Sequence, residues 1–196
     1  MTAAIKAAKK ALRAQMTARR KALTPECRAA ASRQMLHKLY ALPVYQRAET
    51  VFLYASMPDE VQLYDLMERA LAAGKTVCLP LITGKGTMAA VRLPSMAALV
   101  TGQFGILTVD KSKRELVAAE CIDLIIVPGA AFDRSGHRLG LGAGFYDRFM
   151  TEKAPQAYRC ALAFACQLAA RVPVEPHDAL VQHIITEKES FTITQR

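Results

Sequence analysis

Hydrophobic residues at the start of the chain recur with the period of an α-helix. At 100° per residue, the apolar positions of residues 3–22 fall within one narrow arc, which predicts an amphipathic helix; these positions are Ile5, Ala8, Leu12 and Met16. Thr24 and Pro25 then carry the signature of an N-cap followed by proline at the first helical position. We therefore expect a second helix that runs to about Leu42.

Basic residues form a second stripe on the first helix, beside the apolar one, and consist of Lys6, Lys9, Arg13 and Arg20. Arg19 falls on the apolar arc itself, where a long cation must either extend into water or meet an anion at the edge of the core. This stripe is either a solvated helix face or a surface for an anion such as a polyphosphate, and its proximity to the phosphate-type loop described below favours the second.

Beyond residue 42, short apolar runs alternate with segments of helical periodicity. We expect strands at Thr50–Ala55, Thr76–Leu81, Met88–Leu93, Ile122–Val127, Arg159–Ala165, His183–Thr186 and, at an edge, Phe191–Thr194. We expect helices at Val61–Ala73, which Gly74 ends, and at Ala143–Lys153, with single helical turns at Met96–Thr101 and Arg114–Ala119. This alternation indicates an α/β fold with a mostly parallel sheet covered on both faces. Ligands bind such sheets beyond the carboxyl ends of the strands.

The segment Ile125–Met150 carries the most chemistry in the chain. An apolar run breaks at Pro128-Gly129 and leads into a polar loop with Arg138, three alternating glycines and an aromatic–acidic end; these residues are Gly140, Gly142, Gly144, Phe145, Tyr146 and Asp147. Glycines allow successive N–H groups to converge on an anion. The segment therefore predicts a phosphate site with a stacking surface and an option for a metal. The alternative to a phosphate site is a tight glycine-rich connection between strand and helix. In that case Asp147 is an ordinary acid in the first turn of the helix.

Two nucleotide fingerprints do not fit this segment, because the loop lacks GxGxxG and the chain lacks GxxxxGK[ST]. No GxSxG motif is present either, so a serine-hydrolase triad is not indicated. Glu60 follows the strand that is predicted to begin at Thr50, and it is either a helix-start acid or an acceptor for the donor-rich edge of a ring ligand. For His177-Asp178 we expect a turn with local hydrogen bonds rather than a catalytic dyad.

Composition and charge narrow the class of protein. A chain of 196 residues without a linker-like segment fits a single domain, and no apolar run of membrane-spanning length occurs. Five cysteines without a CxxC pair indicate a reducing cytoplasm and no structural zinc. The basic N-terminus lacks a secretory signal, with a mitochondrial presequence as the alternative.

The net charge of +9 is concentrated at the start of the chain. Residues 1–40 hold ten of the 26 Lys and Arg residues and one of the 17 acids, Glu26, which leaves 16 basic and 16 acidic residues elsewhere. The basic excess therefore predicts an anionic partner for this segment.

Several motifs resemble the 5-formyltetrahydrofolate cyclo-ligase family, also called 5,10-methenyltetrahydrofolate synthetase, and together they span nearly the whole chain. They are Lys9-x-x-x-Arg13 with Arg19 beyond, YASMPDE (Tyr54 to Glu60), GQFGI (Gly102 to Ile106), PGAAFDRSGHRLGLGAGFYDRF (Pro128 to Phe149), VPVEPHD (Val172 to Asp178) and IITE (Ile184 to Glu187). The resemblance implies a three-layer α/β/α fold similar to the NagB/RpiA/CoA-transferase group. It also implies ATP- and Mg²⁺-dependent closure of 5-formyltetrahydrofolate to 5,10-methenyltetrahydrofolate, with release of ADP and phosphate.

The resemblance also assigns roles to residues. Catalytic roles fall to Arg138 and Tyr146, and Asp147 would hold Mg²⁺. Folate would contact Ala55, Met57, Glu60, Phe145 and Tyr146. ATP would contact Lys9, Lys10, Arg13, Arg138, Leu139, Gly140, Leu141, Gly142, Ala143, Gly144, Phe145 and Tyr146.

Three positions depart from the family pattern. Phe145 replaces the first residue of a Tyr-Tyr pair, and Ala143 stands where some members carry a lysine. Gln182 replaces an aspartate that can serve as a metal ligand, which points to weaker metal binding. This last departure motivates an alternative function as a folate- or nucleotide-binding regulator with lost turnover. A further alternative is an RNA-binding module that uses the basic stripe. For the enzyme we expect a cytoplasmic monomer with no nucleic-acid or membrane partner.

Overall fold

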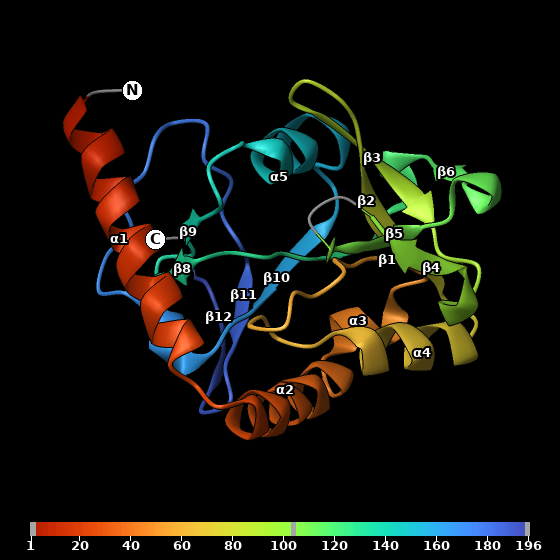
Figure 1. Cartoon of the computed structure of the whole chain (residues 1–196), viewed down its shortest axis with the longest axis horizontal. Helices are drawn as coiled ribbons and strands as arrows, with labels where there is room; N and C mark the ends of the chain where they lie inside the picture. Colours follow the sequence, from red (N-terminus) through yellow and green to blue (C-terminus); the bar gives the residue numbers. More distant parts are fainter. Residues whose placement is uncertain (1–2, 103–104, 195–196) are drawn as a thin grey trace.

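An eight-stranded sheet lies at the centre of the computed structural model, between two layers of helices (Figure 1), in the described residues 3–102 and 105–194. The strand order is β12-β11-β10-β7-β1-β2-β3-β6. The five central strands, β11-β10-β7-β1-β2, run parallel to one another. The remaining strands β12, β3 and β6 pair antiparallel, as β11–β12, β2–β3 and β3–β6. The prediction of a mostly parallel sheet is therefore confirmed.

The bounds of the main-sheet strands are β1 Thr50–Phe52, β2 Thr76–Gly84, β3 Thr87–Arg92, β6 Leu116–Val117, β7 Leu124–Ile126, β10 Tyr158–Leu162, β11 His183–Ile185 and β12 Ser190–Thr192. Two small hairpins lie outside it, β4 Leu99–Thr101 with β5 Leu107–Val109 and β8 Ala131–Phe132 with β9 Arg138–Leu139. The helices are α1 Ala3–Lys21, α2 Pro25–Tyr40, α3 Pro43–Arg47, α4 Tyr64–Ala72 and α5 Phe145–Arg148, which continues as a π-helical turn over Phe149–Lys153. The 3₁₀ turns are Met96–Ala98, Lys111–Lys113, Ala119–Cys121 and Ala165–Gln167.

Alternating residues of the central strands face the two helical layers. Val51 and Leu53 belong to one core, together with buried residues of α2 and α4, whereas Phe52 packs into a second core with Phe149. The rings of Phe52 and Phe149 stack with centroids 4.9 Å apart. This period of two follows from the pleat of a strand, which sends successive side chains to opposite faces.

Several local predictions are confirmed. The first helix spans Ala3–Lys21, and Thr24 caps the second helix by accepting a hydrogen bond from the Cys27 N–H at 3.2 Å. Gly74 ends α4 with a φ of +77°, in the left-handed region that favours glycine. The edge strand near residue 191 is β12, which pairs antiparallel with β11.

Other predictions are wrong at particular segments. Arg114–Ala119 is not a helical turn, because Leu116 and Val117 pair with β3 as strand β6. The predicted helix from Val61 begins only at Tyr64, since the Ser56 side chain binds the backbone of residues 61 and 63 and holds an extended turn. Met96–Thr101 combines a 3₁₀ turn with strand β4. Two residues of the GQFGI motif, at positions 103 and 104, lie outside the described residues.

Helix α1 packs with a face that is rotated from the apolar arc toward the basic stripe. Ala8 and Arg19 are exposed, whereas Arg20 is 5% exposed and Met16 is 3% exposed. Of the two alternatives for Arg19, the structure shows the first, because Arg19 is exposed to water, and it is Arg20 that meets an anion. No helix in the described parts of the chain has the length and hydropathy that a membrane crossing requires.

Candidate active site

The glycine-rich loop, residues 140–144, joins the β8–β9 hairpin to α5 (Figure 1). Arg138 was expected in a polar loop but lies in strand β9, opposite Phe132. A side chain at Gly140 would place Cβ 2.7 Å from the Arg138 guanidinium. Gly142 and Gly144 have φ values of +110° and +68°. Glycine is therefore favoured at 142 and 144 by backbone conformation, and a side chain at 140 would displace the Arg138 guanidinium.

The loop directs its carbonyl groups toward arginines and leaves its N–H groups available. The Gly140 carbonyl accepts from Arg13 Nε at 2.9 Å, and the Ala143 carbonyl accepts from Arg148 Nη2 at 2.8 Å. Among the described residues, no acceptor is found for the N–H groups of residues 141–144. Successive unpaired N–H groups beside cations are the arrangement that binds a phosphate.

Arg138 and Asp147 form a shielded ion pair at the base of this loop. Arg138 Nη2 lies 2.5 Å from Asp147 Oδ1, which also accepts from the Ala179 N–H at 3.1 Å. Four buried side-chain polar atoms in the described part of the chain lack a partner, and two of them, Arg138 Nε and the Tyr146 hydroxyl, belong to this site. Buried polar groups are normally hydrogen-bonded, so these two atoms point to a ligand that supplies the missing partners.

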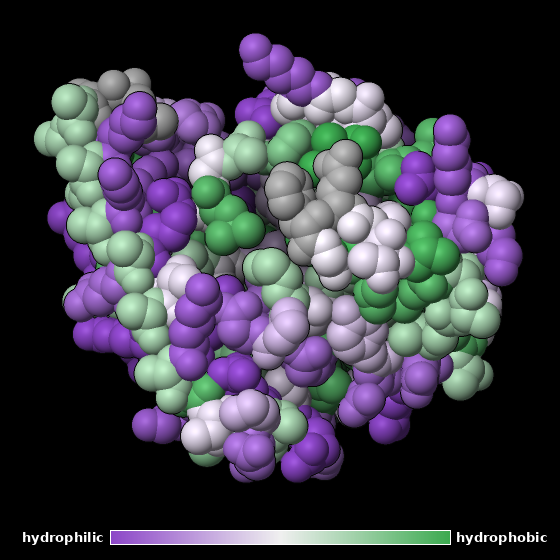
Figure 2. All heavy atoms as spheres, viewed as in Figure 1, coloured by the Kyte–Doolittle hydropathy of each residue, from purple (hydrophilic) through white to green (hydrophobic). Residues whose placement is uncertain are grey.

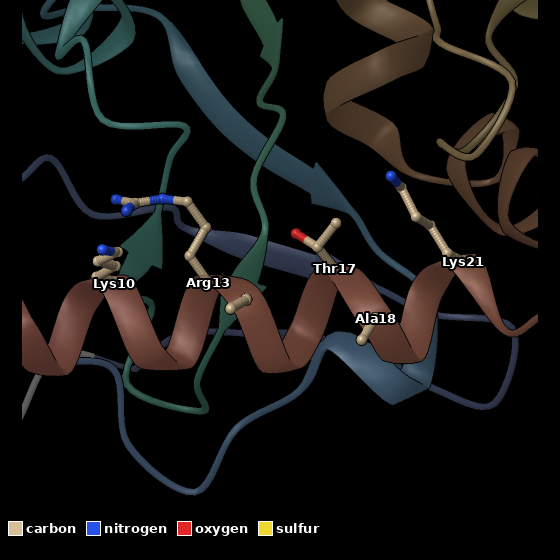
Figure 3. A pocket seen from close by; sticks show the side chains of 6 residues that line it. Lys10, Arg13, Thr17, Ala18 and Lys21 are labelled. Carbon is tan, nitrogen blue, oxygen red and sulfur yellow. The ribbon is translucent and has the colours of Figure 1, made fainter.

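Helix α1 brings its cations to the opposite side of the loop (Figure 3). Lys10, Arg13, Thr17 and Lys21 line an open groove of about 490 Å³ together with two alanines of the same helix. Figure 2 shows hydrophilic residues interleaved with weakly hydrophobic ones along the left margin of the molecule, where Figure 1 places α1. The groove therefore presents positive charge beside the available loop N–H groups.

Lys9 lies on the same helix but pairs with acids of the C-terminal segment. Its Nζ lies 3.0 Å from Glu175 Oε2 and 2.6 Å from Asp178 Oδ2. Burial lowers the pKa of Lys9, but the hydrogen bonds and charges of the two acids outweigh burial and raise it above its ordinary value. Glu175, His177 and Asp178 form a group that could hold a cation, and the Lys9 ammonium already neutralises two of its members.

The second wall of the site is the segment Ser56–Glu60, which follows β1. Glu60 is buried, and its Oε2 accepts from the Met57 N–H at 3.0 Å. Burial raises the pKa of Glu60, while the Met57 N–H and the Arg20 guanidinium oppose the rise. Ala55 is buried beside this segment and Met57 is half-buried. A carboxylate with one oxygen held by backbone and the other near a cation is suited to accept N–H donors from a ligand.

Tyr146 lies between the two walls. Its ring packs edge-on against Phe52, with centroids 6.1 Å apart. Burial raises the pKa of Tyr146 well above its usual value, and the charge of Glu60 adds to the rise while Arg138 opposes it. The pKa of Tyr146 is thus influenced by the charge of Glu60 in one wall and by the charge of Arg138 in the other. The neighbouring Phe145 is half-buried, with the Arg148 guanidinium 5.8 Å from its ring centroid.

Gln182, which stands where the family pattern has a possible metal-binding aspartate, has its side chain engaged elsewhere. Its side-chain oxygen accepts from the Arg159 N–H at 2.8 Å, at the amino ends of β10 and β11. The acid that lies next to the Asp147 contact is Asp178, which precedes Ala179. Asp178 also accepts from the Glu175 N–H at 2.8 Å, so the predicted turn with local hydrogen bonds is confirmed.

Sequence reasoning missed two arginines that shape the site. Arg20 binds Asp59 with Nη2 at 2.8 Å and Nε at 3.2 Å. Arg148 donates to Gly86 and Ala143, and so connects the β2–β3 hairpin to the glycine loop. The position of Arg20, four residues after Met16 on the helix, could have indicated burial, but its charge placed it with the basic stripe.

Comparison with known proteins identifies the fold and the family. A model of the 5-formyltetrahydrofolate cyclo-ligase family matches residues 5–187. The chain belongs to this family. The mouse (Mus musculus) 5-formyltetrahydrofolate cyclo-ligase is 31% identical over 193 residues, covering 93% of this chain and 95% of the relative. The Escherichia coli (strain K12) protein of the same name is 32% identical over 175 residues, covering 86% and 94%. The structure of Aquifex aeolicus 5,10-methenyltetrahydrofolate synthetase superposes with a TM-score of 0.84 at 32% identity, covering 96% of this chain and 94% of that one.

Proposed function

We propose that this chain catalyses the ATP-dependent closure of 5-formyltetrahydrofolate to 5,10-methenyltetrahydrofolate, with release of ADP and phosphate. The family and the names of the relatives support a ligase of this kind. The observation that carries the proposal is the pair of unpartnered buried atoms, Arg138 Nε and the Tyr146 hydroxyl, between a phosphate-type loop and a buried carboxylate. A site of this form can bring a phosphoryl donor and a ring substrate together.

The two walls divide the binding of the two substrates. The N–H groups of residues 141–144, with Arg138, Lys10 and Arg13, would contact the phosphates of ATP, whereas Lys9, which the resemblance also assigns to ATP, has its ammonium on Glu175 and Asp178. Glu60 would accept donors from the pterin edge, with Ala55, Met57, Phe145 and Tyr146 around the folate. Transfer of the terminal phosphoryl group of ATP to the formyl oxygen releases ADP and makes that oxygen a leaving group. N10 then attacks the formyl carbon, the C–O bond breaks to release phosphate, and N10 loses its proton. Phosphoryl transfer of this kind relies mainly on positioning and on neutralisation of charge.

The residues present fit a Mg²⁺ ion that is shared with phosphate. Mg²⁺ binds through one or two carboxylates together with phosphate oxygens and waters. Asp147 Oδ1 is engaged by Arg138 and Ala179, and no partner for Oδ2 is found in the described ranges. Asp147 would hold the ion through Oδ2, and the ion would neutralise phosphate charge. The chain's own contribution is the Arg138 contact, which fixes the orientation of the carboxylate.

A product assay tests the proposal directly. Purified protein with 5-formyltetrahydrofolate, ATP and Mg²⁺ should form the methenyl product, which absorbs in the near ultraviolet, and omission of ATP should abolish the signal. Absence of ATP-dependent product at high enzyme concentration would contradict the proposal. Saturable binding without product would instead support the regulatory alternative, which the relatives' names do not favour.

Two substitutions test the division of labour. Arg138→Ala should raise the KM for ATP more than the KM for folate, and Glu60→Ala should do the reverse. Arg134→Ala and Glu68→Ala are matched controls, because both side chains are exposed. Equal effects of the two site variants on both substrates would contradict the assignment of one wall to each substrate.

A further inference from the structure

Arg20 is buried in a chain region where most cations are exposed. Among the described residues, Arg20 and Arg138 are the arginines with the least exposed surface, at 5% each. Arg20 donates through Nε and Nη2 to Asp59 Oδ2, and its Nη1 lies 3.6 Å from Glu60 Oε1. One guanidinium therefore serves two adjacent carboxylates. Removal of such a buried cation leaves both acids without compensation.

Helix α1 connects the two walls of the site through this residue. Arg13 contacts the glycine loop, and Arg20 follows seven residues later, which is about 10 Å along a helix. A single rigid element thus contacts the nucleotide wall at one point and the folate wall at another. This arrangement offers a physical link between the two proposed binding regions.

We propose that Arg20 is a positioning residue, which orients Glu60 for the folate ring and couples the folate wall to helix α1. The inference rests on the proposed function of this site. Arg20 acts through Glu60, because Nε and Nη2 donate to Asp59 and Nη1 faces the Glu60 carboxylate as an ion pair. Its loss should therefore affect folate more than ATP.

The electrostatic surroundings of Glu60 give this role a distinctive pH signature. The groups that face Glu60 are Arg20 on α1, Asp59 beside it, Tyr54 after β1, Tyr64 on α4 and Tyr146 on α5. Burial raises the pKa of Tyr54, Tyr64 and Tyr146, so these phenols stay neutral near neutral pH. Burial also raises the pKa of Glu60, and Arg20 opposes that rise.

The sign of the expected effect follows from these directions. Glu60 accepts N–H donors when it is ionised, so the KM for folate should rise as pH falls through the pKa of Glu60. Without Arg20 that pKa moves further up, and the rise in KM begins at a higher pH. Asp59 acts in the opposite direction, because its negative charge raises the pKa of Glu60.

The experiment measures KM and kcat for both substrates between pH 5.5 and 9 in wild type, Arg20→Met, Arg20→Lys and Arg19→Met. We expect Arg20→Met to raise the KM for folate about tenfold at the acid end, because Glu60 loses the cation that lies 3.6 Å from its Oε1. The increase should shrink at alkaline pH, and the KM for ATP should stay within about twofold. Arg20→Lys should recover part of the loss, and Arg19→Met, on the exposed neighbour, should match wild type.

A pH-independent increase in KM, or equal effects of Arg20→Met and Arg19→Met, would overturn the inference. If Arg20→Met does not fold, Asp59→Asn provides the second test, because it should move the rise in folate KM to lower pH. An unchanged or upward shift in Asp59→Asn would overturn the inference as well. Failure of the proposed function is distinguishable, because wild-type protein would then form no methenyl product at any pH.

Discussion

Helices α1 and α4 are attached to the same molecule by different forces. Helix α4 has nine residues and buries Leu66, Met67 and Ala70 in the core. Helix α1 has 19 residues and buries only Met16 and Arg20. The shorter helix is therefore held by apolar burial, whereas the longer one is held largely by polar contacts.

The polar contacts of α1 are with the candidate site and its surroundings, and its Met16 packs in a small apolar cluster with Ala131, Leu139 and Val172 rather than in the two main cores. Lys9 pairs with two acids, Arg13 donates to Gly140 and Arg20 binds Asp59. The Lys9 and Arg20 pairs are mostly buried, and the attraction within such pairs is largely offset by the cost of removing both charges from water, so their net contribution to stability is small. Helix α4 thus supplies stability, while α1 places charge where the substrates are proposed to bind.

The largest expected effect is on α4. Leu66→Ala removes a side chain with no exposed surface and should lower the free energy of unfolding by about 2–5 kcal/mol, since it leaves a cavity in the core. The KM values for ATP and folate should stay within about twofold of wild type. Denaturant unfolding and steady-state kinetics on the folded variant measure the two quantities. A large change in KM would break the proposed separation between the helices.

The second expected effect is on α1, where substitution should change the KM for a substrate and leave stability nearly unchanged. Arg13→Met removes the cation at the glycine loop and should raise the KM for ATP about ten- to a hundredfold, which corresponds to a lost charged hydrogen bond of about 1.5–3 kcal/mol. The free energy of unfolding should change by less than about 1 kcal/mol. Arg19→Met on the same helix is the control. The comparison fails if Arg13→Met destabilises the fold as much as Leu66→Ala does.

The smallest expected effect concerns local opening without any substitution. Amide hydrogens of α1 should exchange faster than those of α4, because α1 buries fewer apolar side chains. Addition of ATP with Mg²⁺ should slow exchange in α1 and leave α4 nearly unchanged. Hydrogen exchange followed by mass spectrometry measures both. Equal protection of the two helices in the ligand-free protein would contradict the difference in attachment.

Local features of the fold could be predicted because neighbouring residues determine them. The helical period of residues 3–22, the Thr24 cap and the glycine that ends α4 all depend on short-range geometry. The β8–β9 hairpin could not be predicted, because its two-residue strands carry little periodic pattern. The same holds for β6, whose identity as a strand comes from its pairing with β3.

Prediction of the candidate site met a similar limit. The glycine loop and Arg138 are predictable from the local residue pattern, because alternating glycines allow successive N–H groups to converge on an anion beside the arginine. Arg20 was not identified, since its partner Asp59 is 39 positions away. Gln182 was expected to matter for a metal, but its side chain is committed to the Arg159 N–H.

By itself, the sequence determined the helical and strand periods, the glycines that the loop requires and the surplus of positive charge on the first helix. The tertiary structure alone decided which face of α1 packs and which acid meets each cation. Lys9, for example, meets Asp178 across 169 positions of sequence. Helical periodicity fixes which residues share a face, but the choice of the packed face depends on acids that the fold brings from distant segments.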